Sequence, residues 1–491
     1  MTRPPPIAAL LLAAACGSAS PAPSALESYE PERAGEGATP NAPPPEPLES
    51  ASGPGWRLND GVFESAVLRL RVRSGGPWVF QEDRDEGQEF VLSTGDTALF
   101  ATRLQVQSTP IDVQADTVWA GYADAMTPID GTATFTFDGR SQAMRAFRAR
   151  NTEAFVAVIT DDGGLWVVQA LFFSGGAARA RTQLAELPEL ASLSGGELRD
   201  LREQLLAQPQ LRIAQNAQFA RATFTNFAEG IRWPLPNNVF WRVRLSRGAL
   251  IEAEDPERRL RFTLGHTRLE SADGAGAHDA LRAQLRCEAP EATSMSLGSL
   301  EGLMSECVDG EGLLRRRRRG VSAVRQGENG PEVVWWIAEA PPQAAIFDET
   351  LPALGAALSF GDAIASIQRE GTQVIDRRLG VRFTIPDGFS FQALEPPTHG
   401  AYLLRAEGGD AASEIAVFAF ANARMMLQHR ARLVGELEER LGEPVADGNT
   451  FTWPGEARMD VADTGAFVLI VDLTGEDHAA FRASIESGFE T

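Results

Sequence analysis

The sequence reads Gly230-Ile231-Arg232-Trp233-Pro234-Leu235-Pro236-Asn237, and 150 residues later it reads Gly380-Val381-Arg382-Phe383-Thr384-Ile385-Pro386-Asp387. Three positions of these octads are identical and four are conservative. Apolar residues alternate in both, which is the period of a half-buried β-strand, and a Pro-Asn or Pro-Asp turn signal follows. The repetition predicts two copies of one structural unit, each opening on a strand and a turn.

The segments that follow the two octads correspond as well. After the first octad we expect strands at 240–245, 249–253 and 260–267, a helix at 278–287, a strand at 333–338 and a helix at 346–360. After the second we expect strands at 389–394, 401–406 and 414–420, a helix at 425–441, a strand at 467–473 and a helix at 478–489. Both copies therefore follow the order strands, helix, strands, helix.

A more divergent first copy lies between residues 56 and 195. Its expected strands are 67–73, 78–81, 90–94, 99–106, 155–159 and 165–173, and its expected helices are 112–126 and 182–193. Runs of strands interrupted by only two helices favour an antiparallel sheet covered by helices over alternating βαβ units. We predict an α+β protein of three tandem antiparallel-sheet domains with helices packed on the sheet.

The chain resembles the PsbP-like family, which consists of small α/β/α sandwiches named for a photosystem II accessory protein and found also in bacterial envelope lipoproteins. The shared features are the Gly-x-Arg-aromatic-x-apolar-Pro-turn hairpins at Gly230 and Gly380 and the order of strands and helices. The resemblance covers nearly all of 56–491 as three tandem copies. It implies this fold and a noncatalytic role in assembly or binding, and it brings no catalytic residues.

The N-terminus has the layout of an export signal. Arg3 precedes an apolar run at 7–15, and Leu12-Ala13-Ala14-Ala15-Cys16-Gly17 resembles a lipoprotein signal, in which the cysteine is acylated. Ala13 stands where that signal usually has leucine. An ordinary secretory signal cut nearby is the alternative. We expect a lipid anchor on Cys16 in the cell envelope, in the outer membrane facing the periplasm or the cell surface.

The segment after Cys16 is dominated by Pro, Ala, Ser, Gly and Glu, so it cannot bury enough apolar surface to fold. The predicted organisation is a signal peptide (1–15), a lipidated disordered tether (16–55), a divergent domain 1 (56–195), a linker helix (196–220), domain 2 (221–366) and domain 3 (367–491).

The charge balance excludes several chemistries. The sequence contains no lysine, so its 45 basic residues are all arginine, and 67 acidic residues give a net charge of -22. This balance disfavours nonspecific nucleic-acid binding, which needs basic side chains on phosphates. The absence of lysine also excludes a phosphate-binding Walker lysine and a Schiff-base lysine.

The run of Arg315, Arg316, Arg317, Arg318 and Arg319 is the sharpest local anomaly in so acidic a chain. Guanidinium groups bind phosphates and carboxylates in pairs of hydrogen bonds, so the run is a candidate contact for lipid headgroups, lipopolysaccharide or an acidic partner. The alternative is a solvated arm of an edge strand, where charge discourages edge-to-edge pairing.

Cys287 and Cys307 remain as an even pair once Cys16 is lipidated. Disulfides persist in oxidising compartments, and a bridge over this short loop would contribute about 3 kcal/mol by restricting the unfolded chain. Two buried free thiols are the alternative.

No histidine pair has metal-ligand spacing. The five histidines are His266, His278, His399, His429 and His478. His266 and His278 flank a loop and could meet with Asp273 or Asp279, but a solvated or hydrogen-bonded histidine is the interpretation that we favour. Acidic residues between Glu82 and Glu89 could bind calcium or form a charged hairpin tip. We predict no catalytic, cofactor-binding or metal-binding residue.

Together these observations favour a noncatalytic cell-envelope lipoprotein that acts as a binding or assembly accessory at the membrane surface. Its expected partner is another envelope protein or polymer and not a nucleic acid. The alternatives are a small-molecule-binding lipoprotein with an interdomain pocket and a hydrolase with an unrecognised acid and histidine site.

Overall fold

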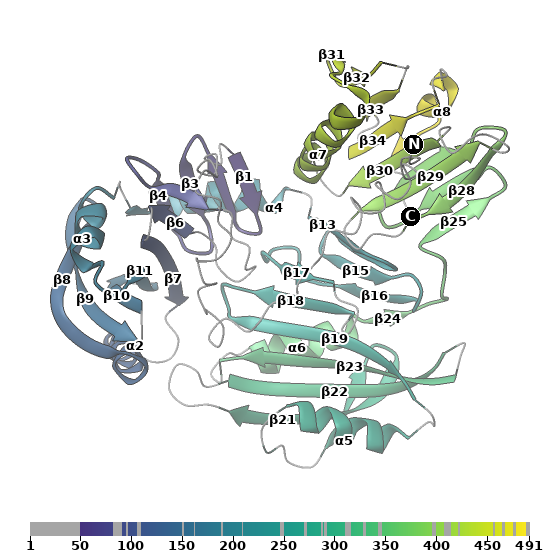
Figure 1. The fold of residues 1–491 in the computed structure, drawn as a ribbon. Coiled ribbons are helices and arrows are strands. Elements are labelled where there is room, and N and C mark those ends of the chain that lie inside the picture. Colours follow the sequence, from purple (N-terminus) through teal and green to yellow (C-terminus); the bar gives the residue numbers. More distant parts are fainter. Residues whose placement is uncertain are drawn as a thin grey trace.

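The computed structural model describes residues 50–81, 91–94, 97–105, 110–149, 152–161, 163–187, 190–208, 210–245, 250–269, 273–285, 288, 292–309, 316–327, 330–341, 346–394, 399–406, 414–420, 423–454, 457–463, 467–474 and 478–487. These residues form five β-sheets and seven helices (Figure 1). Their strand pairs are antiparallel except for one parallel contact between Leu190 and Phe137. The predicted α+β class, with antiparallel sheets and helices, is confirmed.

The first group of elements is called copy 1. Its strands are β1 (Ser50–Gly53), β2 (Trp56–Asn59), β3 (Val62–Ser65), β4 (Leu70–Arg73), β5 (Val79–Gln81), β6 (Val91–Thr94), β7 (Thr97–Gln105), β8 (Thr127–Phe137), β9 (Arg140–Ala149), β10 (Thr152–Asp161), β11 (Gly164–Phe173) and β12 (Leu190–Ser192), and its helices are α2 (Ile111–Ala125) and α3 (Ala177–Ala185). A linker helix, α4 (Gly195–Leu206), follows.

Copy 2 comprises β13 (Leu211–Ala214), β14 (Ala217–Ala220), β15 (Thr223–Asn226), β16 (Ile231–Pro234), β17 (Arg242–Arg244), β18 (Ile251–Asp255), β19 (Leu260–Arg268), α5 (Gly274–Gln284), β20 (Thr293–Leu297), β21 (Leu300–Asp309), β22 (Arg316–Gly327), β23 (Gly330–Ala340), α6 (Ile346–Ala356) and β24 (Ser359–Phe360).

Copy 3 comprises β25 (Ile367–Glu370), β26 (Gln373–Asp376), β27 (Val381–Thr384), β28 (Phe389–Ala393), β29 (Gly400–Ala406), β30 (Glu414–Phe420), α7 (Ala423–Leu441), β31 (Val445–Asp447), β32 (Thr450–Thr452), β33 (Arg458–Asp463), β34 (Phe467–Asp472), α8 (Ala479–Ala483) and β35 (Glu486–Ser487).

One strand topology recurs in the three copies. Copy 2 has sheets ordered β13-β14-β15-β16-β24 and β17-β18-β19-β23-β22-β21-β20, and copy 3 has β25-β26-β27-β35 and β28-β29-β30-β34-β33-β32-β31. Copy 1 joins the equivalent sheets into one, ordered β1-β2-β3-β4-β12-β8-β9-β10-β11-β7-β6-β5. Each copy thus has a meander (β1–β4, β13–β16 or β25–β27), a seven-stranded unit, and a closing strand that returns to the meander. The predicted domain boundaries themselves stay predictions, but two predicted segments are corrected. The linker helix expected at 196–220 ends at Leu206, because residues 211–220 pair into the meander as β13 and β14, and residues 50–53 of the expected tether form β1.

The closing elements differ from those expected. The helices predicted at 182–193, 346–360 and 478–489 are shorter, and each is followed by a strand of two or three residues, β12, β24 or β35. These strands pair with β4, β16 and β27 respectively. A strand of two or three residues is too short to show an apolar period in the sequence. Its position is set instead by pairing with the meander that it joins.

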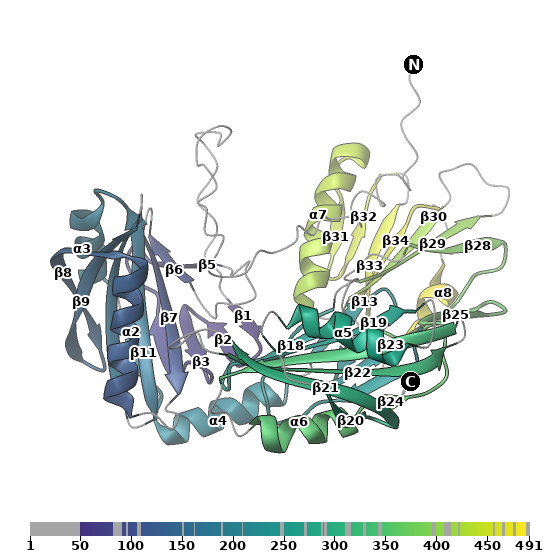
Figure 2. The ribbon, with the colours of Figure 1, turned by 90° about the horizontal axis from the view of Figure 1, so that it is seen from below.

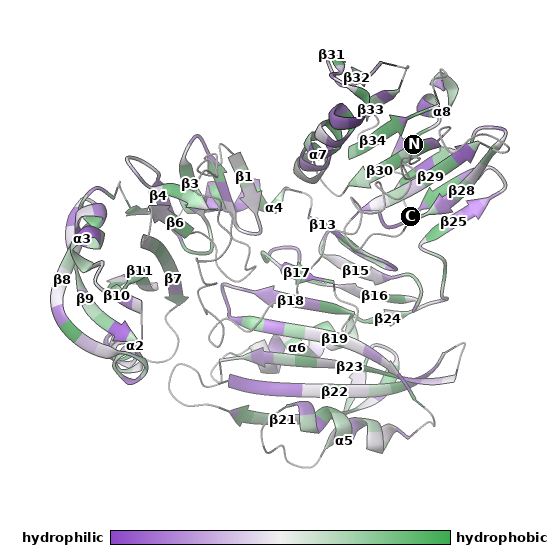
Figure 3. Ribbon diagram, in the orientation of Figure 1, coloured by the Kyte–Doolittle hydropathy of each residue, from purple (hydrophilic) through white to green (hydrophobic). Residues whose placement is uncertain are grey.

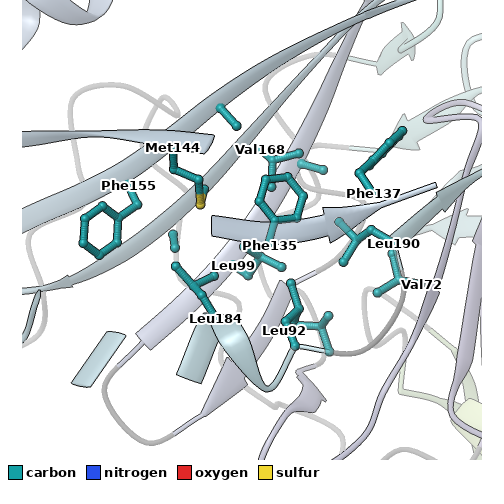
Figure 4. Close-up of a cluster of buried hydrophobic side chains, with 14 of the residues drawn as sticks. Val72, Leu92, Leu99, Phe135, Phe137, Met144, Phe155, Val168, Leu184 and Leu190 are labelled. Atoms are coloured by element: carbon teal, nitrogen blue, oxygen red, sulfur yellow. The ribbon is translucent and has the colours of Figure 1, made fainter. Parts of the chain in front are cut away.

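Each seven-stranded unit is covered on both faces. In copy 1, alternate residues of β10 enter two different cores: Phe155 and Ala157 face the meander and α3, whereas Ala154 and Val156 face α2. Figure 4 shows the first of these cores, where Val72, Leu184 and Leu190 converge on the sheet. In copy 3 the meander and α8 cover one face and α7 the other, with the polar side of α7 turned outward (Figure 3).

The last turn of each meander is built in the same way. A buried polar residue accepts a backbone N–H from within the turn: Ser65 from Leu68 (2.9 Å), Asn226 from Glu229 (3.1 Å) and Asp376 from Arg378 (2.8 Å). The turn then ends on a residue with positive φ, which is Arg69 (54°), Gly230 (58°) or Gly380 (61°). The two quoted octads therefore begin at the left-handed residue that ends this turn, a conformation that glycine adopts without steric cost.

Copy 2 lies between copies 1 and 3, and α4 runs along its junction with copy 1 (Figure 2). Leu201 and Leu205 of α4 are buried with Val67 of copy 1 and Phe240 of copy 2. Ser194 and Glu197 form a reciprocal capping box that fixes the start of the helix. Arg202 of α4 is paired with Glu257 of copy 2.

A buried ion pair joins copies 2 and 3. The Arg378 side chain is fully buried, lies 2.6 Å from Asp376, and donates to the carbonyl oxygens of Ala214 (3.3 Å) and Gln215 (3.0 Å) in copy 2. Tyr402 donates to the same Asp376 carboxylate. Because a buried charge is tolerated only when its hydrogen bonds are satisfied, this network fixes how copy 3 sits on copy 2.

Candidate functional site

Three side chains with metal-ligand chemistry meet at one end of the copy 2 sheet. The His266 Nε2 atom lies 3.0 Å from Glu332 Oε2 and 3.5 Å from Glu229 Oε2. The side chain of Glu332 is 5% exposed and that of His266 is 12% exposed. We call Glu229, His266, Glu332 and the neighbouring Arg325 the histidine–carboxylate cluster.

Strand alternation directs this cluster toward the meander. Leu260, Phe262 and Leu264 of β19 enter the core, so His266 lies on the same face two residues further along. Glu332 of β23 and Arg325 of β22 likewise lie on the core-facing side of their strands, and they are directly opposite one another. Glu229 arrives from the turn between β15 and β16.

Arg325 holds the two carboxylates together. Its Nη2 atom lies 3.3 Å from Glu229 Oε2 and 3.0 Å from Glu332 Oε2, and its Nε atom donates to Glu332 over 3.0 Å. Gly327 allows Glu332 to fold back, because a Cβ at that position would overlap the Glu332 carboxylate. Buried carboxylates with such donors are strongly oriented.

The arginine run is divided between the two faces of β22. Arg317 and Arg319 lie on the core side, 2.6 Å and 2.7 Å from Glu306. Arg318 lies on the opposite side, where it donates to the carbonyl oxygen of Leu285 (2.8 Å) and contacts Asp309 (3.1 Å). Arg315 lies outside the described residues.

The alternative of an edge strand is wrong, because β22 pairs with β21 and β23 on its two sides. Residues 319–323, which include the last arginine of the run, are buried, as expected for an interior strand.

Arg316 and Arg318 share their face of the sheet with Arg259 and Arg261, and we call these four residues the arginine face. Arg261 and Arg318 both lie opposite Glu339, across the β19–β23 and β22–β23 pairs. Burial, together with the charge of Arg316, lowers the pKa of Arg259 to about 10. Burial also lowers the pKa of Arg316, which is near Arg261 and Arg318. The cations are therefore crowded against one another.

His266 and His278, which could have met across their loop, do not come together. His278 is a residue of α5, and its side chain is buried between this helix and the sheet. Its two ring nitrogens contact Ser322 Oγ (2.8 Å) and Ser305 Oγ (3.0 Å) there. Burial lowers the pKa of His278. Asp273 caps α5 through Gly276, and Asp279 pairs with Arg282. His278 thus has the satisfied core role that was its alternative interpretation.

A second histidine pair lies in copy 3. The rings of His399 and His429 are 5.2 Å apart and contact Phe418 and Phe420. Burial lowers the pKa of His399 to about 4 and that of His429 to about 3. Arg432 approaches His429 Nδ1 at 2.9 Å. Both rings are therefore neutral over the ordinary pH range.

Several predicted features fall outside the described residues. They include Cys16 and the tether up to residue 49, the acidic segment 82–90, and Cys287. Cys307 is buried in β21. Since it is the one cysteine that the structure describes, the Cys287–Cys307 bridge stays a prediction. Within the described ranges, no helix has the length and apolar character that crossing a bilayer requires.

No protein-family model and no curated protein matches the chain. A crystal structure from Bacteroides thetaiotaomicron is 11% identical over 44% of this chain, with a TM-score of 0.23, and the chain spans 60% of its length. The T6SS immunity protein TplEi of Pseudomonas aeruginosa is 10% identical over 58% of this chain and 97% of its own, with a TM-score of 0.18. The MucA/MucB complex of Pseudomonas aeruginosa is 12% identical over 62% and 85%, with a TM-score of 0.15. These TM-scores are too low to show a shared fold, so the resemblance to the PsbP-like family stays a prediction.

Proposed function

We propose that the protein is a noncatalytic binding or assembly accessory of the cell envelope, anchored by a lipid on Cys16 and carrying a rigid array of three copies. The junctions support this proposal most directly. The ion pair of Arg378 and Asp376 is fully buried, and α4 is packed on both of its neighbours. Because these junctions hold the copies in fixed positions, a large partner would meet one surface of fixed shape.

The arginine face is the surface that we assign to the partner. Arg261 is exposed, and Arg259 and Arg316 are half-buried beside it. In a chain of net charge -22, a cluster of guanidinium groups attracts acidic groups that the rest of the surface repels. We propose that the partner is an envelope protein with an acidic segment.

Affinity capture of the full-length lipoprotein from its own envelope tests this function. The variant Arg259→Ala/Arg261→Ala should recover the partner at a yield reduced about tenfold, as expected from losing one or two charge-assisted hydrogen bonds. Arg199→Ala/Arg440→Ala is the matched control, because both side chains are exposed on other elements, α4 and α7, and this variant likewise removes two positive charges. Equal yields from all three proteins would exclude the arginine face as the contact.

The anchor is tested separately. Cys16→Ser should release the protein from the membrane fraction, because two acyl chains on one cysteine supply the double anchor that stable attachment needs. Retention of that variant in the membrane fraction would contradict the lipid attachment.

A further inference from the structure

We propose that Glu229, His266 and Glu332 bind one divalent transition-metal ion, for which Zn²⁺ has the matching ligand chemistry. The bound ion would connect the copy 2 meander, through Glu229, to strands β19 and β23. This site is independent of the proposed partner contact, which lies on the opposite face of the same sheet.

The distances between the ligand atoms fit a shared ion. Zn²⁺ binds imidazole nitrogen and carboxylate oxygen at about 2.0–2.2 Å, so neighbouring ligand atoms in its coordination sphere lie roughly 3–3.5 Å apart. His266 Nε2 lies 3.0 Å from Glu332 Oε2 and 3.5 Å from Glu229 Oε2. All three ligand atoms lie within 4.8 Å of one another. Small side-chain shifts would be enough to bring them onto one ion.

The His266 ring supplies the second observation. Its Nε2 atom is buried and forms no hydrogen bond within the described part of the chain, although two carboxylate oxygens lie near it. Neither neutral tautomer is satisfied here: with the proton on Nδ1 the Nε2 lone pair faces the carboxylate oxygens, and with the proton on Nε2 the N–H forms no hydrogen bond with them. A cation between the nitrogen and the oxygens removes this conflict.

Arg325 is placed to act in the outer shell of the metal site. Its guanidinium bonds both ligand carboxylates and fixes their orientation, as hydrogen-bond donors do around many metal sites. Two carboxylates and one guanidinium leave a charge of -1 when His266 is neutral, so the cluster can still attract a cation. The mixed nitrogen and oxygen set suits Zn²⁺ better than Ca²⁺ or Mg²⁺, which prefer oxygen ligands alone.

The Glu229 side chain is 22% exposed, so an ion and its remaining water ligands have a route from the surface. Among the residues that the structure describes, this is the one group of three such ligands. At the equivalent sheet end of copy 1, Arg103 pairs with Asp161 (2.8 Å) and its guanidinium lies 4.0 Å from the Trp166 ring centre. The Arg103 guanidinium places a positive charge at this position, so the site in copy 1 does not offer a set of metal ligands.

The competing account is that His266 is an imidazolium and balances the charge without a metal. Titration of the full-length, chelator-treated protein with Zn²⁺ against a chromophoric competitor separates the two accounts. We expect one ion per chain and a higher urea midpoint for the copy 2 transition when Zn²⁺ is present. His266→Gln and Glu229→Gln should each weaken binding by more than about tenfold.

Glu229→Gln keeps the shape and the hydrogen bond of a partly exposed residue, so it guards against loss of folding. His478→Gln is the matched histidine control, because that ring lies in copy 3 and bonds Thr474. The proposal is overturned if Zn²⁺ binds without a one-to-one endpoint, or if His266→Gln and His478→Gln bind it equally well. A folded Glu229→Gln protein with undiminished affinity would also overturn it.

Discussion

Two structural constraints favour glycine at position 230. Its φ is +58°, and a Cβ there would overlap the carbonyl oxygen of Gly361, where the chain leaves copy 2. Gly230→Ala should therefore lower the free energy of unfolding of copy 2 by more than about 1 kcal/mol, measured from urea transitions.

Gly371 is subject to the first of these constraints but not to the second. Its φ is +62°, but a Cβ there would meet open space, so Gly371→Ala carries the conformational cost alone. Gly230→Ala should shift its transition further than Gly371→Ala does. Equal shifts would mean that the contact with Gly361 carries no energy.

The buried histidines of copy 3 make stability depend on pH. The pKa of His399 is lowered to about 4 and that of His429 to about 3 by burial, whereas unfolded histidine titrates near pH 6.5. The stabilisation of folded copy 3 by its neutral histidines is complete above pH 6.5 and is lost as the pH falls from 6.5 toward 4. In this range the unfolded chain binds protons at these histidines, whereas the folded copy does not.

Urea midpoints between pH 7.5 and pH 4.5 measure this effect. His429→Gln, which stays uncharged, should flatten the pH dependence of the copy 3 transition, whereas His478→Gln in the same copy should leave it as steep. A wild-type midpoint that stays constant down to pH 4.5 would contradict the lowered pKa values.

The sequence singles out His266 and also carries a signal for Glu332 and Arg325, but it carries none for Glu229. Glu332 and Arg325 interrupt the core-facing rows of β23 and β22, and a charged residue at such a position is a signal that alternation alone can reveal. That Glu229 joins them depends on how the meander packs on the sheet. No spacing along the chain encodes that contact, so the cluster could not be predicted as a site.

Long elements were predicted well and short ones were not. The helices expected at 112–126 and 425–441 correspond to α2 and α7 within two residues at each end, because each spans several turns with one apolar face. The closing strands β12, β24 and β35 were missed. Their two or three residues become strands only when the meander supplies the partner, which is a tertiary effect.

The linker helix α4 offers a test of the first junction. Leu201→Ala or Leu205→Ala should lower the free energy of unfolding by about 2–5 kcal/mol, since each removes a buried leucine from the contact with Val67 and Phe240. Arg199→Ala, on the exposed side of α4, should change it by less than about 0.5 kcal/mol. If copies 1 and 2 unfold unchanged in the leucine variants, α4 does not couple them.

At the scale of the whole molecule, the arrangement of copies 2 and 3 depends on the ion pair at their junction. Arg378→Ala leaves Asp376 buried without its counter-charge, which costs about 3–5 kcal/mol. It also removes the hydrogen bonds to Ala214 and Gln215. We expect copy 3 to separate from copy 2, so small-angle X-ray scattering should report a larger radius of gyration.

Arg377→Ala is the control for this variant. It removes a charge one residue away, and its side chain is half-buried and bonds Gln368 within copy 3. Its scattering curve should match that of the wild type. If Arg378→Ala also scatters like the wild type, the ion pair does not hold the array together.

The closing strands bring the end of each copy back to the last strand of its meander. Leu193 donates to the carbonyl oxygen of Arg69 (3.0 Å) after copy 1, and Gly361 donates to that of Gly230 (2.8 Å) after copy 2. A unit that completes its own sheet in this way can fold without strands from the units beside it. An extra unit inserted by recombination at residue 361 should therefore fold, but it would move Arg378 away from the carbonyl oxygens of Ala214 and Gln215 that it bonds.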